Sequence, residues 1–157
     1  MDSLHHSYDH RKRVEATAFR TCNCLHEIDI LDYEEVMEAE VLKGAAKEEV
    51  DIKERCSILE VANDPGDEFV SIARARVGIG VVTALHCLKG VAERYLIVSG
   101  VGRVELGGQD PIEVAEGDVV RIPPDTPQRI ANIGTGDLVF YCICTPPFHP
   151  NCYQALE

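Results

Sequence analysis

Three side chains that could bind a metal or transfer a proton lie in two segments that each begin with a glycine. His86 and Glu93 lie in the first segment, residues 80–100, and Gln128 lies in the second, residues 117–132. One imidazole, one carboxylate and one amide oxygen could hold a single divalent transition metal, and Fe, Mn, Ni and Zn all suit this donor set. Without a metal, His86 and Glu93 could hydrogen-bond to each other or act as an acid–base pair on a bound substrate. All three are candidate metal ligands, and His86 and Glu93 are also candidate catalytic residues.

The elements that must position these side chains are short extended segments. Runs of β-branched, aromatic and alternating residues, separated by Gly, Pro, Asn and Asp, predict strands. The predicted strands are 56–62, 69–77, 81–88, 94–99, 102–106, 112–114, 118–122, 128–132 and 137–144. Many short strands at this spacing predict an all-β fold, either an antiparallel sandwich or a barrel.

The N-terminal third has a different composition. Residues 1–26 are polar and unpatterned, which predicts a disordered or loosely ordered tail. Residues 27–55 form an acidic segment, in which helix formers and apolar spacing over 32–46 predict one short helix. Residues 56–157 are expected to form the barrel, with the C-terminal tail packed on it.

Composition and charge exclude several classes of function. The 157 residues hold 15 Lys plus Arg against 27 Asp plus Glu, so the formal net charge is −12. This balance argues against a nucleic-acid partner, because binding to phosphate backbones needs basic side chains. The apolar runs are too short to cross a bilayer, so no membrane association is expected. Seven cysteines and no recognisable signal peptide predict free thiols and a cytoplasmic location.

The two segments that begin with Gly80 and Gly117 resemble the two motifs of the cupin superfamily. Those motifs are G-x5-H-x-H-x4-E-x6-G and G-x5-P-x-G-x2-H-x3-N. The matching residues are Gly80, His86, Glu93, Gly100, Gly117, Pro123 and Asn132. The resemblance implies a double-stranded β-helix, or jelly-roll, barrel. It also implies a degenerate metal site, because Leu88 and Gln128 stand where metal-binding cupins have histidines.

Such a barrel would gather the candidate residues into one pocket. Side chains two positions apart on a strand face the same side. The set expected to converge inside the barrel mouth is His86, Leu88, Glu93, Tyr95 and Gln128. Tyr95 would form part of the pocket wall with a usable hydroxyl, which makes it a third candidate catalytic residue.

Arg74 and Arg76 alternate with small residues on the predicted strand 69–77, so one face of this strand is charged. An arginine pair can bind a carboxylate or phosphate in bidentate fashion, so both are candidate substrate-binding residues, together with Gln128. The alternative is a pair of arginines that face solvent or pair with acidic residues.

Three of the cysteines are expected to be buried, inert thiols. This applies to Cys87, which should face away from the pocket, and to Cys142 and Cys144. A zinc site from Cys144, His149 and Cys152 is conceivable. The alternative for this region is that the C-terminal tail packs over the barrel.

Three functions remain open. The first is a metal-dependent enzyme, isomerase- or dioxygenase-like, that acts on a small polar or anionic substrate. The second is a non-catalytic cupin that binds or senses a small-molecule ligand at a degenerate site. The third is an interaction role for the acidic N-terminal third. Cupin barrels commonly pair through sheet edges, so a homodimer is expected.

Overall fold

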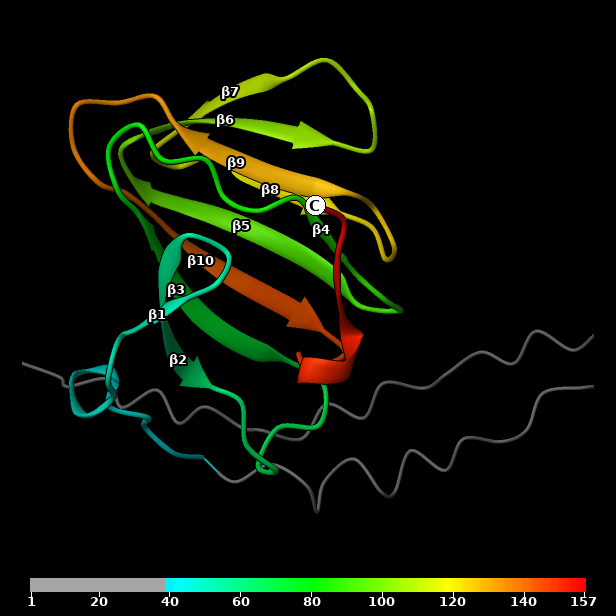
Figure 1. Ribbon diagram of the computed structural model, residues 1–157. Coiled ribbons are helices and arrows are strands. Elements are labelled where there is room, and N and C mark those ends of the chain that lie inside the picture. Colours follow the sequence, from blue (N-terminus) through cyan, green and yellow to red (C-terminus); the bar gives the residue numbers. More distant parts are fainter. Residues whose placement is uncertain (1–38) are drawn as a thin grey trace, which may run out of the picture. The chain divides into compact units, whose positions relative to one another are not determined.

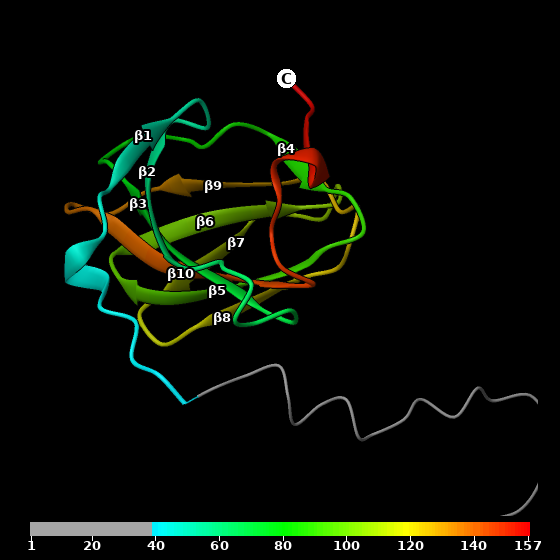
Figure 2. The ribbon, with the colours of Figure 1, turned by 90° about the horizontal axis from the view of Figure 1, so that it is seen from below.

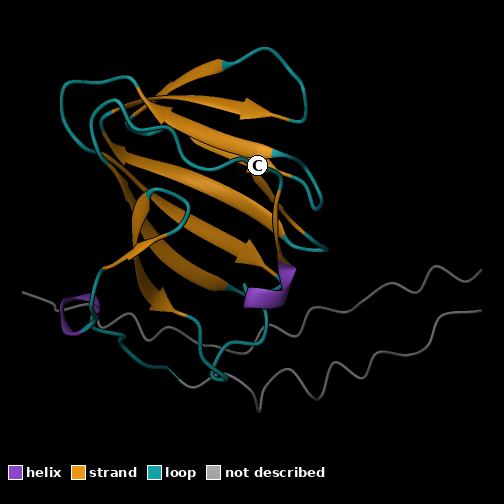
Figure 3. Ribbon diagram, viewed as in Figure 1, coloured by secondary structure: helices purple, strands orange, loops and turns teal. Residues whose placement is uncertain are grey.

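The computed structural model describes residues 39–157, and almost all of its regular structure is β-strand (Figures 1 and 3). The strands are β1 (Val50–Ile52), β2 (Cys56–Ala62), β3 (Ser71–Val77), β4 (His86–Leu88), β5 (Ala92–Ser99), β6 (Val101–Leu106), β7 (Ile112–Ala115), β8 (Val119–Ile122), β9 (Gln128–Asn132), β10 (Leu138–Thr145) and β11 (Tyr153–Ala155). Two 3-10 turns, Gly44–Ala46 and Pro150–Cys152, complete the described elements.

The strands form two antiparallel sheets. The order in the larger sheet is β1-β2-β3-β10-β5-β8, and the order in the smaller sheet is β11-β4-β9-β6-β7. Both sheets contribute to one apolar core, which includes Val77, Ile97 and Phe140 from the larger sheet and Val104 and Ile130 from the smaller. Figure 2 shows the two sheets wrapping around this shared interior. The prediction of an all-β fold is confirmed, and the structure divides the strands into two sheets.

Strand boundaries follow the alternation of inward apolar and outward polar residues. Each strand predicted from the sequence is present, but the one expected over 81–88 is much shorter. Only His86–Leu88 pairs as a strand, and Val82 forms an isolated bridge with Ala131. The short strands β1 and β11 were not predicted, because three residues are too few to show a period of two.

The turn between β5 and β6 requires glycine. Gly100 has a φ of +88°, and a Cβ at this position would lie 2.7 Å from the carbonyl oxygen of Asp137. Any other side chain would therefore be strained and would also clash with the backbone that leads into β10. This tight reversal links the long strand β5, which carries Glu93 and Tyr95, to the opposite sheet.

The predicted tail 1–26 and residues 32–38 of the predicted helix lie outside the described residues. In the described remainder of that helix, only Gly44–Ala46 is helical, as a 3-10 turn. β1 lies within the range 27–55 and pairs with β2. No helix within residues 39–157 is both long and apolar enough to cross a membrane.

Candidate functional site

Strand register brings the candidate residues together. His86 on β4 lies directly opposite Gln128 on β9, in the smaller sheet. In the larger sheet, Glu93 and Tyr95 on β5 lie opposite Cys144 and Cys142 on β10. Residues opposite each other in an antiparallel pair share a face, so these side chains all point into the interior.

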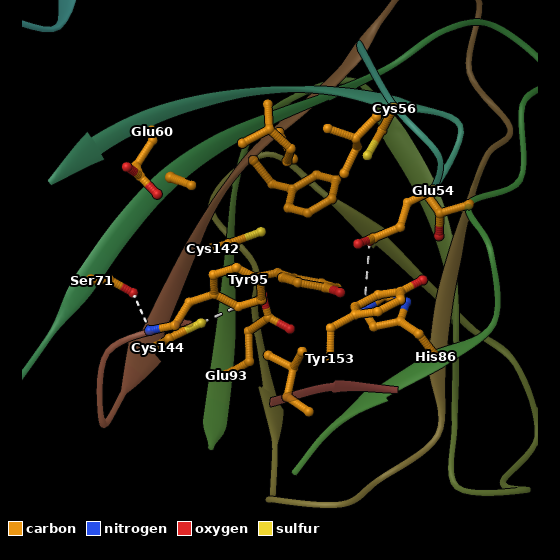
Figure 4. A pocket seen from close by; sticks show the side chains of 18 of the residues that line it. Glu54, Cys56, Glu60, Ser71, His86, Glu93, Tyr95, Cys142, Cys144 and Tyr153 are labelled. Carbon is orange, nitrogen blue, oxygen red and sulfur yellow. Dashed lines mark hydrogen bonds and ion pairs between the residues drawn. The ribbon is translucent and has the colours of Figure 1, made fainter. Parts of the chain in front are cut away.

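The interior holds a cavity of about 410 Å³, whose polar side chains are shown in Figure 4. Most of its wall is apolar, with Ile72, Leu88, Ile130 and Phe140 among its members. The polar groups that reach it include Glu54, His86, Glu93, Tyr95 and Tyr153. An apolar chamber with a few aimed polar groups is typical of a small-molecule site.

His86 is held in one orientation. Its Nδ1 lies 2.9 Å from the carbonyl oxygen of Ala84. A carbonyl can only accept, so Nδ1 carries the proton and Nε2 of the neutral ring is an acceptor. The ring of Tyr153 stacks on the imidazole, with 5.1 Å between the ring centroids. The basic nitrogen Nε2 is thus directed toward the carboxyl group of Glu54, with 3.7 Å between Nε2 and Oε2.

Glu54 is a site residue that sequence reasoning missed. It lies in the turn between β1 and β2, outside both cupin-like motifs, and no signal in the sequence singles it out. Its carbonyl oxygen accepts a hydrogen bond of 3.0 Å from the amide of Ala84, which ties this turn to the segment before β4. The neighbouring Arg55 pairs with Glu157 and donates to the carbonyl of Val82. Burial raises the pKa of the Glu54 carboxyl, and the nearby His86 opposes this rise.

Glu93, Gln128 and Tyr95 form a buried hydrogen-bond chain. The Tyr95 hydroxyl donates to Oε1 of Gln128 at 3.0 Å, and Nε2 of Gln128 donates to Oε2 of Glu93 at 2.8 Å. The thiol of Cys144 lies 3.8 Å from the other Glu93 oxygen. Burial raises the pKa of Glu93, while the hydrogen bond from Gln128 counteracts part of this rise. Burial also raises the pKa of the Tyr95 phenol, so it stays protonated and acts as a donor.

Arg74 and Arg76 are not among the residues that line this cavity. They lie on the opposite face of β3, where both pair with Glu49. Arg76 also lies 3.6 Å from Asp137. The structure therefore corrects the substrate-binding assignment of the two arginines. They match the alternative in which the two arginines pair with acidic residues. Alternation along β3 directs them outward, while Ala73 and Ala75 face the cavity.

Comparison with known proteins identifies the family of this chain. Residues 80–144 match the model of the Cupin domain family. Uncharacterized protein MJ1618 of Methanocaldococcus jannaschii is 38% identical over 87 residues, which make up 55% of this chain and 69% of that protein. The chain belongs to the cupin superfamily.

Solved cupin structures share the fold. Pac13, described as a unique nucleoside dehydratase, superposes with a TM-score of 0.65 at 16% identity, over 76% of this chain and 92% of Pac13. Structures of Streptomyces Pac13 variants have been solved with uridine. A predicted oxalate decarboxylase from Thermotoga maritima has a TM-score of 0.62 at 20% identity, over 68% of this chain and 99% of that one. At these identities the likeness concerns the fold alone.

The donor set at the cupin metal positions does not fit a metal site. The amide oxygen of Gln128 already accepts from Tyr95, and its amide nitrogen points to Glu93. Gln128 is 1% exposed and is absent from the cavity lining. Within residues 39–157, no group of three His, Cys, Asp or Glu side chains is arranged to hold a metal ion. In this arrangement Gln128 positions Glu93 and does not face the cavity, and the His86–Glu93–Gln128 ligand set stays a prediction.

Three cysteines line the cupin cavity: Cys56, Cys142 and Cys144. Burial raises the pKa of Cys56 and of Cys144 to about 12, and it raises the pKa of Cys142 as well. Thiols with such a pKa are poor nucleophiles at neutral pH. Cys87 faces elsewhere, with its sulfur 3.7 Å from the side-chain oxygen of Gln154.

The C-terminal tail packs on the barrel. Cys144 and Cys152 form a second apolar cluster with Leu88 and Val91, against which Phe148 and Tyr153 pack. β11 extends the smaller sheet by pairing with β4. The tail thus supplies Tyr153, the second site residue missed from sequence, which stacks on His86.

Proposed function

We propose that this cupin is a small-molecule enzyme that moves a proton on a substrate bound in the barrel, as in an isomerisation or dehydration. The observation that carries the proposal is the His86–Glu54 pair at the cavity wall. The 3.7 Å between Nε2 and Oε2 is too long for a direct hydrogen bond. Both groups are therefore free to exchange protons with a substrate bound beside them.

The roles follow from the hydrogen bonds. Because Nδ1 of His86 is bound to the Ala84 carbonyl, Nε2 accepts the substrate proton as general base. Because its pKa is raised, Glu54 can give its proton to the substrate oxygen in the same step, and the carboxylate that this leaves stabilises the imidazolium of His86. Tyr153 holds the plane of the ring by stacking. Glu93, oriented by Gln128, supplies a second polar contact for the substrate.

The fold likeness to Pac13 supports this proposal, because Pac13 is described as a nucleoside dehydratase. The donor set described above favours proton transfer by the side chains themselves over the metal-dependent, dioxygenase-like alternative. A homodimer also remains part of the proposal, and light scattering of the purified protein tests it.

Proton exchange tests the function directly. The protein is incubated in D2O with a panel of α-hydroxy ketones and α-hydroxy aldehydes, and loss of the α C–H signal is followed by NMR. His86→Asn and Glu54→Gln should lower the exchange rate by about 10²-fold or more, the usual range for a general acid–base group. His149→Gln, a histidine substitution at an exposed position, is the matched control and should not change the rate.

Two results would contradict the proposal. Exchange that continues unchanged in His86→Asn would show that another group does the chemistry. A ligand that binds in the cavity without any exchange would favour the non-catalytic binding or sensing cupin.

A further inference from the structure

The charges around the cavity are unbalanced. The carboxyl groups of Glu54 and Glu93 reach it from the β1–β2 turn and from β5, and Glu60 lines it as well (Figure 4). Lys53 is the only Lys or Arg among the described residues of its wall, and its side chain is exposed. Among the described residues of the wall, His86 is the remaining side chain that can carry a positive charge. Carboxyl groups thus outnumber fixed cations inside.

Glu93 is the clearest case. It is 6% exposed, and the hydrogen bonds that it receives within residues 39–157 come from uncharged donors, the amide of Gln128 and the thiols of Cys142 and Cys144. None of the ion pairs found among residues 39–157 involves Glu93. A buried carboxylate without a cation is unfavourable, and the raised pKa of Glu93 reflects this cost.

The remaining wall suits the organic part of a ligand. Phe140 packs against Tyr95 with 4.5 Å between the ring centroids, and Phe148 and Tyr153 contribute further rings. Aromatic faces attract cations through their quadrupole, and the aliphatic residues Ile72 and Ile130 accept hydrocarbon. Charge and surface chemistry therefore point to the same kind of molecule.

We infer that the ligand of this cavity is an organic cation, a protonated amine on an apolar body, with its charge placed between Glu54 and Glu93. This inference names the substrate class for the proposed function and rests on the same cavity. The amine supplies the positive charge that the protein does not, whereas a carboxylate or phosphate ligand would meet two acidic groups. The small anionic substrate considered from the sequence is thereby replaced.

A consequence is that binding must be linked to protons. A cation beside Glu93 favours the ionised carboxylate, so the amine lowers the pKa of that group and releases a proton on binding. Affinity for the amine should accordingly rise with pH until both carboxyl groups are ionised, while affinity for an uncharged analogue should not.

Three compounds with one skeleton test the inference: benzylamine, benzyl alcohol and benzoate. Isothermal titration calorimetry at two pH values, in buffers that differ in ionisation enthalpy, measures both affinity and proton release. Benzylamine should bind at least about tenfold more tightly than the other two and should release protons. In Glu93→Gln, which preserves the acceptor for Gln128, this preference and the proton release should be lost. Glu113→Gln on the outer strand β7 is the matched control and should behave as wild type.

Every outcome decides the inference. Equal or tighter binding of the alcohol or of benzoate overturns it, as does failure of benzylamine to bind or a preference that survives in Glu93→Gln. The inference and the proposed function can fail separately. Amine binding with no proton exchange on any substrate refutes the enzymatic proposal alone, whereas exchange on a neutral substrate with no preference for amines refutes this inference alone.

Discussion

Removing the Tyr95 hydroxyl should destabilise the protein by a calculable amount. In Tyr95→Phe the ring that packs against Phe140 is kept, so apolar burial is unchanged. What is lost is the donor to Oε1 of Gln128, 3.0 Å away. Gln128 is 1% exposed, and its amide nitrogen is engaged by Glu93, so the side chain cannot turn to find another donor without breaking that bond.

The expected cost is that of one buried, unsatisfied acceptor, about 1–3 kcal/mol. For a chain of this size, about 2 kcal/mol corresponds to a Tm lower by about 4–8 °C. Urea unfolding followed by circular dichroism measures the free energy of unfolding. Tyr141→Phe is the control, because Tyr141 lies on the opposite face of β10 and makes no hydrogen bond found among residues 39–157.

A double-mutant cycle tests whether the Tyr95 hydroxyl stabilises the protein through its hydrogen bond to Gln128. If the hydroxyl acts through Gln128, Tyr95→Phe should cost much less in a Gln128→Leu background, because the orphaned acceptor is then absent. Equal costs in both backgrounds, or a loss no larger than that of Tyr141→Phe, would refute the proposed chain of hydrogen bonds.

Three further predictions follow from the buried groups. Because burial raises the pKa of Glu93, the folded state holds that proton more tightly than the unfolded state. As the pH rises above 4.5, the ordinary pKa of a glutamate carboxyl, the free energy of unfolding of the wild type should therefore fall relative to that of Glu93→Gln. Urea unfolding measured over this pH range checks the prediction, and an equal pH dependence in the two proteins would contradict it. With a pKa of about 12, Cys56 and Cys144 should resist iodoacetamide at pH 8 in the native protein and react only in urea, as peptide mass spectrometry can show. Added Mn, Ni or Zn should shift the Tm of wild type no more than that of His86→Asn, and a larger shift in wild type would restore a metal-binding role for this site.

Much of the site was predictable because strand periodicity and two spaced motifs are local properties. The pairs of residues that face one side of β5 follow from alternation alone, and the motif order implied that His86, Glu93 and Tyr95 meet in one cavity. Gln128 lies near them, and its hydrogen bonds give it the task of orienting Glu93. Its donors and acceptors are consumed by Tyr95 and Glu93, which depends on side-chain rotamers that no spacing rule contains.

The missed residues have a common cause. Glu54 lies in a turn and Tyr153 in a three-residue strand, and neither element carries a periodic signal. Both reach the site through long-range pairing, since β11 aligns with β4 and the β1–β2 turn is tied to Ala84. The outward direction of Arg74 was one of two possibilities in the sequence, and only its ion pair with Glu49 decides between them.

Alternating polarity and glycine-marked turns, both read over a few residues, were enough to predict an all-β chain, and the resemblance to the cupin motifs implied an imidazole and a carboxylate inside it. Which groups lie beside them was decided only by the folded arrangement. Partners such as Glu54 and His86 are distant in the chain, and the free energy of their contact depends on distance, burial and orientation. The distance, burial and orientation of these groups are set only when the two sheets fold around the cavity.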